Sequence, residues 1–218
     1  MKTLINPIEA RASRTAKRNP DASRLALIEA TLDSIAEDGI AETSVSRIIE
    51  RAGLSRGMIH LHFGGKDNLL TAAARQFGEE YYDAMDRMTD LGPEASPEDQ
   101  IMAIVRADLS EELLNARSTK IWHAFRGASS SHPGIARYSS TQDEKLVAKL
   151  KRAFSLLAIQ CRESPDLAED ATSGTLALLE GMWVIYLTDI EGFSRQRAVD
   201  LIRRFFSGLF PGKFGVDG

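Results

Sequence analysis

Apolar side chains recur at intervals of three and four residues along most of this 218-residue chain, and no segment alternates apolar with polar residues. The observed spacing is that of an amphipathic α-helix, whereas alternation would mark a half-buried strand. Proline is tolerated in the first turn of a helix or outside it, but not in its interior. The prolines after the N-terminal region fall between the periodic segments, at Pro93, Pro97, Pro133, Pro165 and Pro211. The sequence therefore predicts an all-α fold.

We expect nine helices. Their approximate ranges are 21–38, 45–52, 56–62, 66–90, 97–114, 117–129, 135–162, 166–190 and 195–209. Ser44, Ser55 and Ser96 are the expected N-caps, because a serine hydroxyl can accept the free N–H groups of a first turn. Gly39 and Gly53 supply the left-handed residue that often ends a helix. The segment 1–20 is basic, with Arg11, Arg14, Lys17 and Arg18, and we expect it to be a flexible arm.

Two short helices joined by a tight glycine turn, over residues 43–63, predict a helix-turn-helix. Leu54, Ile59 and Phe63 are expected to face the core. The start and the outer face of the second helix then meet the edges of DNA bases, and helix N-termini present N–H groups to phosphates. The expected DNA contacts are Thr43, Ser44, Ser46, Ser55, Arg56, Gly57, Met58, His60, Leu61, His62 and Lys66.

Residue chemistry separates the roles within this set. The Arg56 guanidinium can read guanine or clamp a phosphate, and Lys66 can hold a further phosphate. Gly57 is a poor helix former. A glycine at this position is explained if the backbone must come close to the DNA groove. The alternative is a helical hairpin inside a plain bundle. That alternative leaves the expected exposure of Met58 and Leu61 unexplained.

The two parts of the chain differ in the sign of their net charge. Its net charge is −4, but residues 1–75 carry a net +2 and residues 76–218 a net −6. Such polarity suits a protein that meets phosphate at one end, although an incidental split is an equal alternative on charge alone. The overall acidity disfavours a sequence-neutral DNA binder. Cys161 is the only cysteine, and no run of 18 apolar residues exists, so we expect a cytoplasmic protein without a membrane partner.

The sequence offers no catalytic or metal-binding pattern. The four histidines lack any ligand spacing for a metal, and His60 and His62 point to different sides of one helix. Ser129 and its neighbours near His132 lack the context of a nucleophile elbow. We therefore expect no enzyme, no metal and no cofactor. The rival from another class is a helical ligand carrier or enzyme without operator-specific DNA binding.

Four aromatic residues in the C-terminal part are candidates for a ligand pocket: Trp122, Phe125, Trp183 and Tyr186. Glu180, one turn before Trp183, can supply a negative charge to a cationic effector. For the aromatic residues, packing in a plain core is an equal alternative. For Glu180, the equal alternatives are a solvated position and a place at the rim of a dimer interface.

Residues 43–70 resemble the DNA-binding signature of TetR-family regulators. The resemblance rests on residues 52–55 (AGLS), Gly57, Ile59, residues 62–63 (HF), residues 66–67 (KD) and residues 69–70 (LL). It implies a three-helix DNA-binding domain over 21–65 and a ligand-binding and dimerisation bundle over 66–218. It also implies a homodimer through the helices over 166–190 and 195–209. The sequence departs from the family pattern at two places. His60 stands where the family usually has tyrosine. Gly64-Gly65 precede Lys66 and predict a looser joint to the next helix.

The apolar side chains expected at that dimer interface are Leu176, Leu179, Trp183, Leu187, Ile202, Phe205, Phe206 and Leu209.

Within that family the chain is most similar to BetI-like repressors of choline and betaine genes. The similarity rests on residues 27–32 (LIEATL), 122–125 (WHAF) and 179–183 (LEGMW). It implies a repressor that leaves double-stranded operator DNA when a small-molecule effector binds. Choline or a related quaternary ammonium compound is the implied effector. A hydrophobic effector would use the same aromatic side chains without needing the acid.

Overall fold

The computed structural model describes residues 20–215, apart from the side chains of residues 139–143. Within that range the chain forms helices and no strand, which confirms the all-α prediction. No helix there is long and apolar enough to cross a bilayer. The expected arm over 1–20 lies outside the described residues except for Pro20, which begins the first helix. The helices are α2 (Pro20–Asp38), α3 (Val45–Ala52), α4 (Arg56–Phe63), α5 (Lys66–Met88), α6 (Pro97–Asp108), α7 (Ala116–Ala128), α8 (Pro133–Cys161), α9 (Pro165–Thr188) and α10 (Arg195–Leu209).

Serine caps fix several helix starts. Ser96, Ser164 and Ser194 each accept a hydrogen bond from the backbone N–H three residues further on. These contacts satisfy N–H groups that a helix leaves free in its first turn. Eight of the nine described helices begin and end within two residues of the predicted bounds.

The exception is α6, which ends at Asp108 and not at 114. Beyond it, the guanidinium of Arg195 donates hydrogen bonds to the carbonyl groups of Leu109, Ser110 and Leu114, at 2.7, 3.2 and 2.7 Å. The Ser110 carbonyl also accepts the N–H of Leu114 at 2.9 Å, as it would in a helix, whereas the Leu109 carbonyl accepts from Arg195. Because Arg195 is more than 80 residues away from Leu109 in the chain, local periodicity could not reveal this ending.

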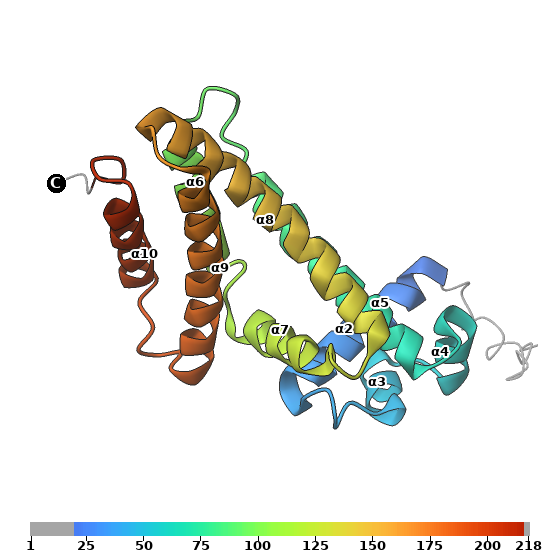
Figure 1. Ribbon diagram of the computed structural model, residues 1–218. Helices are drawn as coiled ribbons and strands as arrows, with labels where there is room; N and C mark the ends of the chain where they lie inside the picture. The colour runs from blue at the N-terminus through green and yellow to red at the C-terminus, as the bar shows by residue number, and fades with distance from the viewer. Residues whose placement is uncertain (1–19, 216–218) are drawn as a thin grey trace, which may run out of the picture.

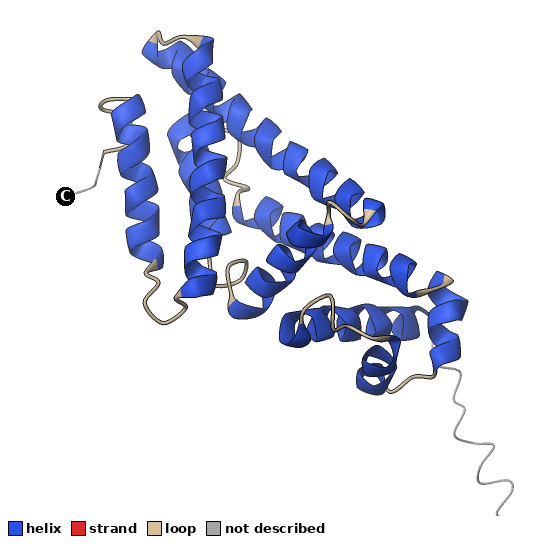
Figure 2. Ribbon diagram, turned by 60° about the horizontal axis from the view of Figure 1, so that its bottom comes forward, coloured by secondary structure: helices blue, strands red, loops and turns tan. Residues whose placement is uncertain are grey.

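Two long helices, α5 and α8, extend between the two ends of the molecule. Figure 1 shows α5 and α8 side by side, with α2, α3 and α4 grouped at one end and α6 and α9 at the other. In both views α10 lies against α9, on the side away from α8 (Figures 1 and 2). Helix α7 crosses between the two ends and packs on α2, α8 and α9.

Buried side chains form two cores. The N-terminal core joins α2, α3, α4 and the first half of α5 to Ile121 and Phe125 of α7 and Ile135 of α8. The C-terminal core joins the second half of α5 to α6, α8, α9 and α10. Trp122 packs against both cores. Helices α5, α7 and α8 therefore connect the two ends.

Candidate DNA-binding surface and effector cavity

Helices α3 and α4 form the expected helix-turn-helix. Ser44 caps α3, with its hydroxyl accepting the N–H of Arg47 at 3.3 Å. Gly53 ends that helix at φ 62°, a left-handed conformation that glycine adopts without strain. Ser55 occupies the N-cap position of α4 but makes no side-chain capping bond. The Ser55 hydroxyl at the start of α4 is therefore not committed to the helix.

The outer face of this unit carries most of the expected DNA contacts. The exposed members are Ser44, Ser46, Ser55, Arg56, Gly57, His60 and Leu61, and Lys66 is half-buried. Leu61, at 74%, is the most exposed large apolar side chain in the described part of the chain. A contact with a thymine methyl group is one use for such a side chain.

Three of the expected contacts do not lie on that outer face. Thr43 is fully buried, and its hydroxyl donates to the carbonyl of Gly39 at 2.8 Å, so it ties the loop after α2. Met58 is half-buried against the N-terminal core. His62 is half-buried, and its Nε2 is enclosed without a hydrogen-bond partner in the described part of the chain. For Met58 and His62, the expected outward position was wrong because the tilt of α4 against α2 and α5 cannot be derived from spacing.

Some of the basic side chains of α3, α4 and α5 form ion pairs and others do not. Arg47 pairs with Asp38 at 2.6 Å, and Arg51 pairs with Glu37, so these two bases of α3 are held against α2. Arg56 and Lys66 form no ion pair with any described residue. Their charges can be directed to phosphate or to a base edge.

Two hydrogen bonds form at the joint between α4 and α5. The N–H of Gly64 bonds to the carbonyl of His60 at 3.0 Å, and the Asn68 side chain donates to the carbonyl of Phe63 at 2.8 Å. Asn68 thereby links the last turn of α4 to the first turn of α5. The expectation of a loose joint did not take this side chain into account, and the looseness itself stays a prediction.

A cavity of about 280 Å³ lies within the C-terminal bundle, between α5, α6, α7, α8 and α9. Its lining is largely aromatic and aliphatic, with one buried acid and one ion pair. The lining residues are Tyr81, Tyr82, Asp108, Trp122, Arg126, Leu146, Val147, Leu176, Leu179, Glu180 and Trp183. An engineered cavity of about 150 Å³ binds benzene, so this one has room for a small organic molecule.

Three aromatic rings on one side of the cavity lie close to one another. The ring centres of Trp122 and Trp183 are 5.6 Å apart, and that of Tyr81 is 5.7 Å from the first and 6.0 Å from the second. Tyr82 packs edge-on against Tyr81, with 4.8 Å between ring centres. These rings come from α5, α7 and α9, so this side of the cavity combines three helices that lie far apart in the sequence.

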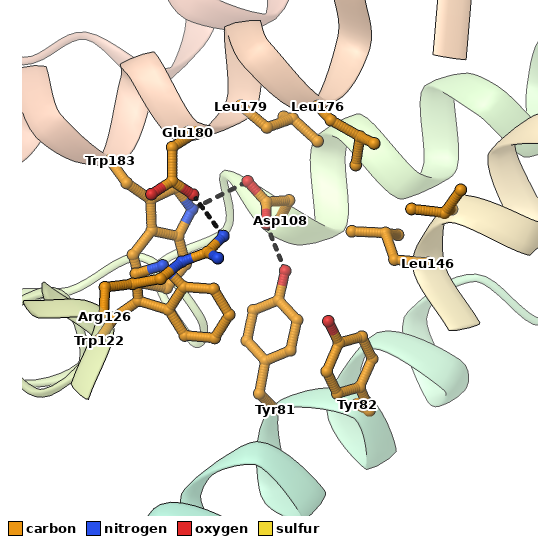
Figure 3. A pocket seen from close by; sticks show the side chains of 11 residues that line it. Tyr81, Tyr82, Asp108, Trp122, Arg126, Leu146, Leu176, Leu179, Glu180 and Trp183 are labelled. Atoms are coloured by element: carbon orange, nitrogen blue, oxygen red, sulfur yellow. Dashed lines mark hydrogen bonds and ion pairs between the residues drawn. The ribbon is translucent and has the colours of Figure 1, made fainter. Parts of the chain in front are cut away.

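Asp108, the last residue of α6, lies among these rings. Figure 3 shows its carboxylate between the Trp183 indole, which donates from Nε1 at 2.9 Å, and the Tyr81 hydroxyl, which also donates to it. Burial raises the pKa of Asp108 to about 6, while these two hydrogen bonds oppose the rise and the charge of Glu180 adds to it. No described cationic side chain forms an ion pair with Asp108. This buried carboxyl group therefore has two hydrogen-bond donors and no cationic partner among the described residues, an arrangement that is uncommon in a protein interior.

The rim of the cavity carries an ion pair between Arg126 of α7 and Glu180 of α9, at 3.2 Å. The Arg126 guanidinium also lies over the ring of Trp122, 5.2 Å from its centre. Both charged side chains are about two-fifths exposed, at 40% and 42%. This is the solvent end of the cavity, and Asp108, which is 3% exposed, marks the closed end.

Three of the five expected ligand residues, Trp122, Glu180 and Trp183, line the cavity. Phe125 points instead to the N-terminal core, where its ring is 6.2 Å from that of Phe77. Tyr186 lies outside the cavity, against Phe193 and beneath the guanidinium of Arg195. Tyr186 is one turn of α9 after Trp183, but it is not among the residues that line the cavity.

Sequence reasoning missed Tyr81, Tyr82 and Asp108. A signal existed for Asp108, because it follows the apolar residues 101–105 and Ala107 on a helix that is otherwise buried. No comparable signal marked the tyrosines. Among the described residues, no group of three or more His, Cys, Asp or Glu side chains is placed to hold a metal ion.

The outer faces of α9 and α10 expose three large apolar side chains, next to Gln196, Arg197 and Arg204 of α10. Val184, Ile185 and Leu201 are 46%, 50% and 48% exposed. The side chains expected at a dimer interface include four that are buried within this chain, namely Leu179, Trp183, Ile202 and Phe206. The other four, Leu176, Leu187, Phe205 and Leu209, are half-buried.

Comparison with known proteins covers both ends of the molecule. Residues 27–73 match the family model described as bacterial regulatory proteins, tetR family, and residues 97–211 match the model described as BetI-type transcriptional repressor, C-terminal. The chain is 34% identical to the HTH-type transcriptional regulator BetI 1 of Chromohalobacter salexigens over 178 residues, 82% of this chain and 85% of that protein. It is 30% identical to BetI of Escherichia coli K12 over 86% of this chain and 94% of that protein.

This chain belongs to the TetR family, with a C-terminal part of the BetI type.

Solved structures agree with this assignment of fold. A transcriptional regulator of Pseudomonas aeruginosa PAO1 superposes with a TM-score of 0.82 at 28% identity, over 93% of this chain and 97% of that one. A transcriptional regulator of Saccharomonospora viridis, solved in complex with choline, superposes with a TM-score of 0.75 at 19% identity, over 86% and 96%. As a BetI-type TetR regulator, the chain is a DNA-binding transcriptional repressor and not an enzyme.

Proposed function

We propose that this repressor binds its operator as a dimer and releases it when a quaternary ammonium cation such as choline enters the cavity. The observation that carries the proposal is the buried carboxylate of Asp108 among the rings of Tyr81, Trp122 and Trp183. A quaternary ammonium has no N–H donors, so aromatic faces and a nearby negative charge are the groups that bind it well.

The comparisons support the same class of effector. The regulator from Saccharomonospora viridis shares the fold and binds choline, and the relatives of higher identity are named BetI. A neutral apolar effector is the second candidate, since the walls of the cavity are mainly apolar. Asp108 disfavours it, because a neutral ligand would leave the carboxylate buried without a countercharge.

On the DNA side, we assign base contact to Arg56, His60 and Leu61, and phosphate contact to Ser44, Ser46, Ser55 and Lys66. Arg56 sits at the first residue of α4, where a recognition helix presents its side chains to the major groove. The phosphate set lies near the starts of α3, α4 and α5. Helix N-termini favour anions there.

For the dimer, we assign the outer face of α9 and α10, which carries three exposed apolar side chains. Burying Val184, Ile185 and Leu201 against a second copy would form a self-complementary, four-helix interface. A two-fold dimer would present two copies of α4 to successive turns of the major groove, about 34–36 Å apart.

Release follows if the effector binds one shape of the molecule better than the other. Helix α7 is the shortest route, because it lines the cavity with Trp122 and packs Ile121 and Phe125 into the N-terminal core. A change in α7 on binding reaches α2, and with it the position of α4. Helix α5 provides a second route, since it lines the cavity with Tyr81 and begins directly after α4.

A DNA mobility-shift titration tests the proposal. We expect the protein to retard DNA from upstream of its own gene at concentrations that leave random DNA free. Choline or betaine aldehyde should reverse the shift, and the neutral carbon isostere of choline, 3,3-dimethylbutan-1-ol, should not. Equal retardation of random DNA would contradict operator recognition. Equal release by the isostere would replace the cation with an apolar effector.

A further inference from the structure

We propose that Arg126 is a resident cation of the cavity, which holds the face of Trp122 until the effector's quaternary ammonium displaces it. The inference rests on the proposed cationic effector and goes beyond it, because it gives a role to a positively charged residue in a cavity expected to bind a positive charge. Figure 3 shows the Arg126 guanidinium between Glu180 and the ring of Trp122.

The geometry satisfies both halves of a cation site. The guanidinium carbon is 5.2 Å from the centre of the Trp122 ring, inside the limit of about 6 Å for a cation–π contact. On its other side, Nη2 is 3.2 Å from a carboxylate oxygen of Glu180. An aromatic face and a carboxylate are also what a quaternary ammonium requires. The effector and Arg126 therefore compete for Trp122.

The position of Arg126 makes this competition reversible. Trp122 and Arg126 are four residues apart on α7, so both project from one face of that helix. Arg126 and Glu180 are both about two-fifths exposed, and an ion pair of that exposure is weak. The side chain can consequently leave the ring and turn to solvent without leaving a buried charge. Asp108, at the closed end, has no such freedom.

Displacement of Arg126 has a consequence for the rest of the molecule. The Arg126–Glu180 pair joins α7 to α9 at the rim of the cavity. At its other end α7 is joined to α2, where Arg117 pairs with Asp33 at 2.9 Å and with Glu29 at 3.1 Å. An effector that breaks the first connection and leaves the second allows α7 to move with the DNA-binding helices.

The test compares the affinity for tetramethylammonium, a bare quaternary ammonium, between the full-length wild-type protein and Arg126→Gln. Calorimetry should show binding to Arg126→Gln that is about 3- to 10-fold tighter, because the competing contacts are each weak. The matched control is Arg87→Gln, which removes a similar exposed ion pair with Glu112 away from the cavity. Its affinity should equal that of the wild type. Circular dichroism confirms that the variants are folded.

A second pair of variants separates displacement from a simple gain in negative charge. In a Trp122→Leu background Arg126 has no ring to occupy, so Arg126→Gln should then change the affinity by less than twofold. An equal gain in both backgrounds would mean that Arg126 acts only through its charge, and would overturn the proposal. Weaker binding by Arg126→Gln would also overturn it and make Arg126 a ligand contact. If wild-type protein binds no tetramethylammonium at millimolar concentration, the cationic effector fails as well.

Discussion

Asp108 is the residue whose protonation should set the pH range of effector binding. Its folded-state pKa of about 6 lies above the ordinary aspartate value of 3.8, because burial disfavours the charged form. The protonated carboxyl therefore favours folding. That stabilising contribution is complete below about pH 4 and is lost as the pH rises through about 6. A cationic effector reverses the preference, since it needs the ionised carboxylate.

We expect the affinity for tetramethylammonium to fall roughly tenfold between pH 7.5 and pH 5, as Asp108 takes up a proton. Asp108→Asn should bind weakly at both pH values and show almost no pH dependence, as measured by calorimetry. The other titratable or charged side chains around the cavity are Tyr81, Tyr82, Arg126 and Glu180.

Stability supplies the control for this variant. Asp108→Asn should raise the free energy of unfolding at pH 8 by about 1–3 kcal/mol, because it removes a buried charge. A variant that is equally or more stable, yet binds the cation poorly, has lost recognition and not structure. Unchanged affinity in Asp108→Asn across the pH range would exclude the carboxylate from the site.

At the scale of single helices, α4 contains a glycine that the protein's own packing does not require. A Cβ atom built at Gly57 would meet nothing closer than the Ser55 hydroxyl, at 3.8 Å. Gly57→Ala should therefore leave the free energy of unfolding equal or raise it by up to about 1 kcal/mol. Its operator affinity should fall about tenfold, or about 1.4 kcal/mol, if the backbone of α4 closely approaches DNA.

Gly127→Ala is the matched control for this substitution. Gly127 is also helical and exposed, and its added Cβ meets nothing within 4 Å. It should gain similar stability and keep the operator affinity of the wild type in a fluorescence-anisotropy titration. Operator binding by Gly57→Ala at the wild-type level would show that α4 does not need a bare backbone at that position.

How far the sequence predicts these elements depends on the range of the contacts that define them. The caps and glycines around α3 and α4 act over three or four residues, so the helix-turn-helix and its bounds could be derived from local pattern. The end of α6 depends on Arg195, and the cavity depends on bringing Tyr81, Asp108 and Trp183 together from three helices. Local pattern carries no information on such contacts. For the same reason Glu180 was expected to be the countercharge, and Asp108 was overlooked.

At the scale of the whole molecule, the exposed face of α9 and α10 predicts an obligate dimer. Leu201→Arg places a charge on a side chain that is 48% exposed, so the fold of one chain should survive it. Sedimentation should show a dimer for the wild type and a monomer for Leu201→Arg at micromolar concentration. Operator affinity should fall with dimerisation, since one half-site supplies only half of the contacts.

Leu91→Arg is the matched control, because Leu91 is a similar side chain, 47% exposed, in the connection between α5 and α6. It should remain dimeric. A wild-type monomer that still binds its operator would remove the need for a second copy.

The sharing of α7 between the two ends also bears on how such regulators can be recombined. Ile121 and Phe125 complete the N-terminal core, and Arg117 pairs with two acids of α2, although about 85 residues separate these partners in the chain. A fusion that joins residues 1–65 of this chain to the effector domain of another regulator would place foreign side chains in that core. The transferable DNA-reading module is therefore discontinuous: it consists of α2 to α4 together with the face of α7 that covers them. During synthesis on the ribosome, the same residues must emerge before the DNA-binding helices can complete their packing.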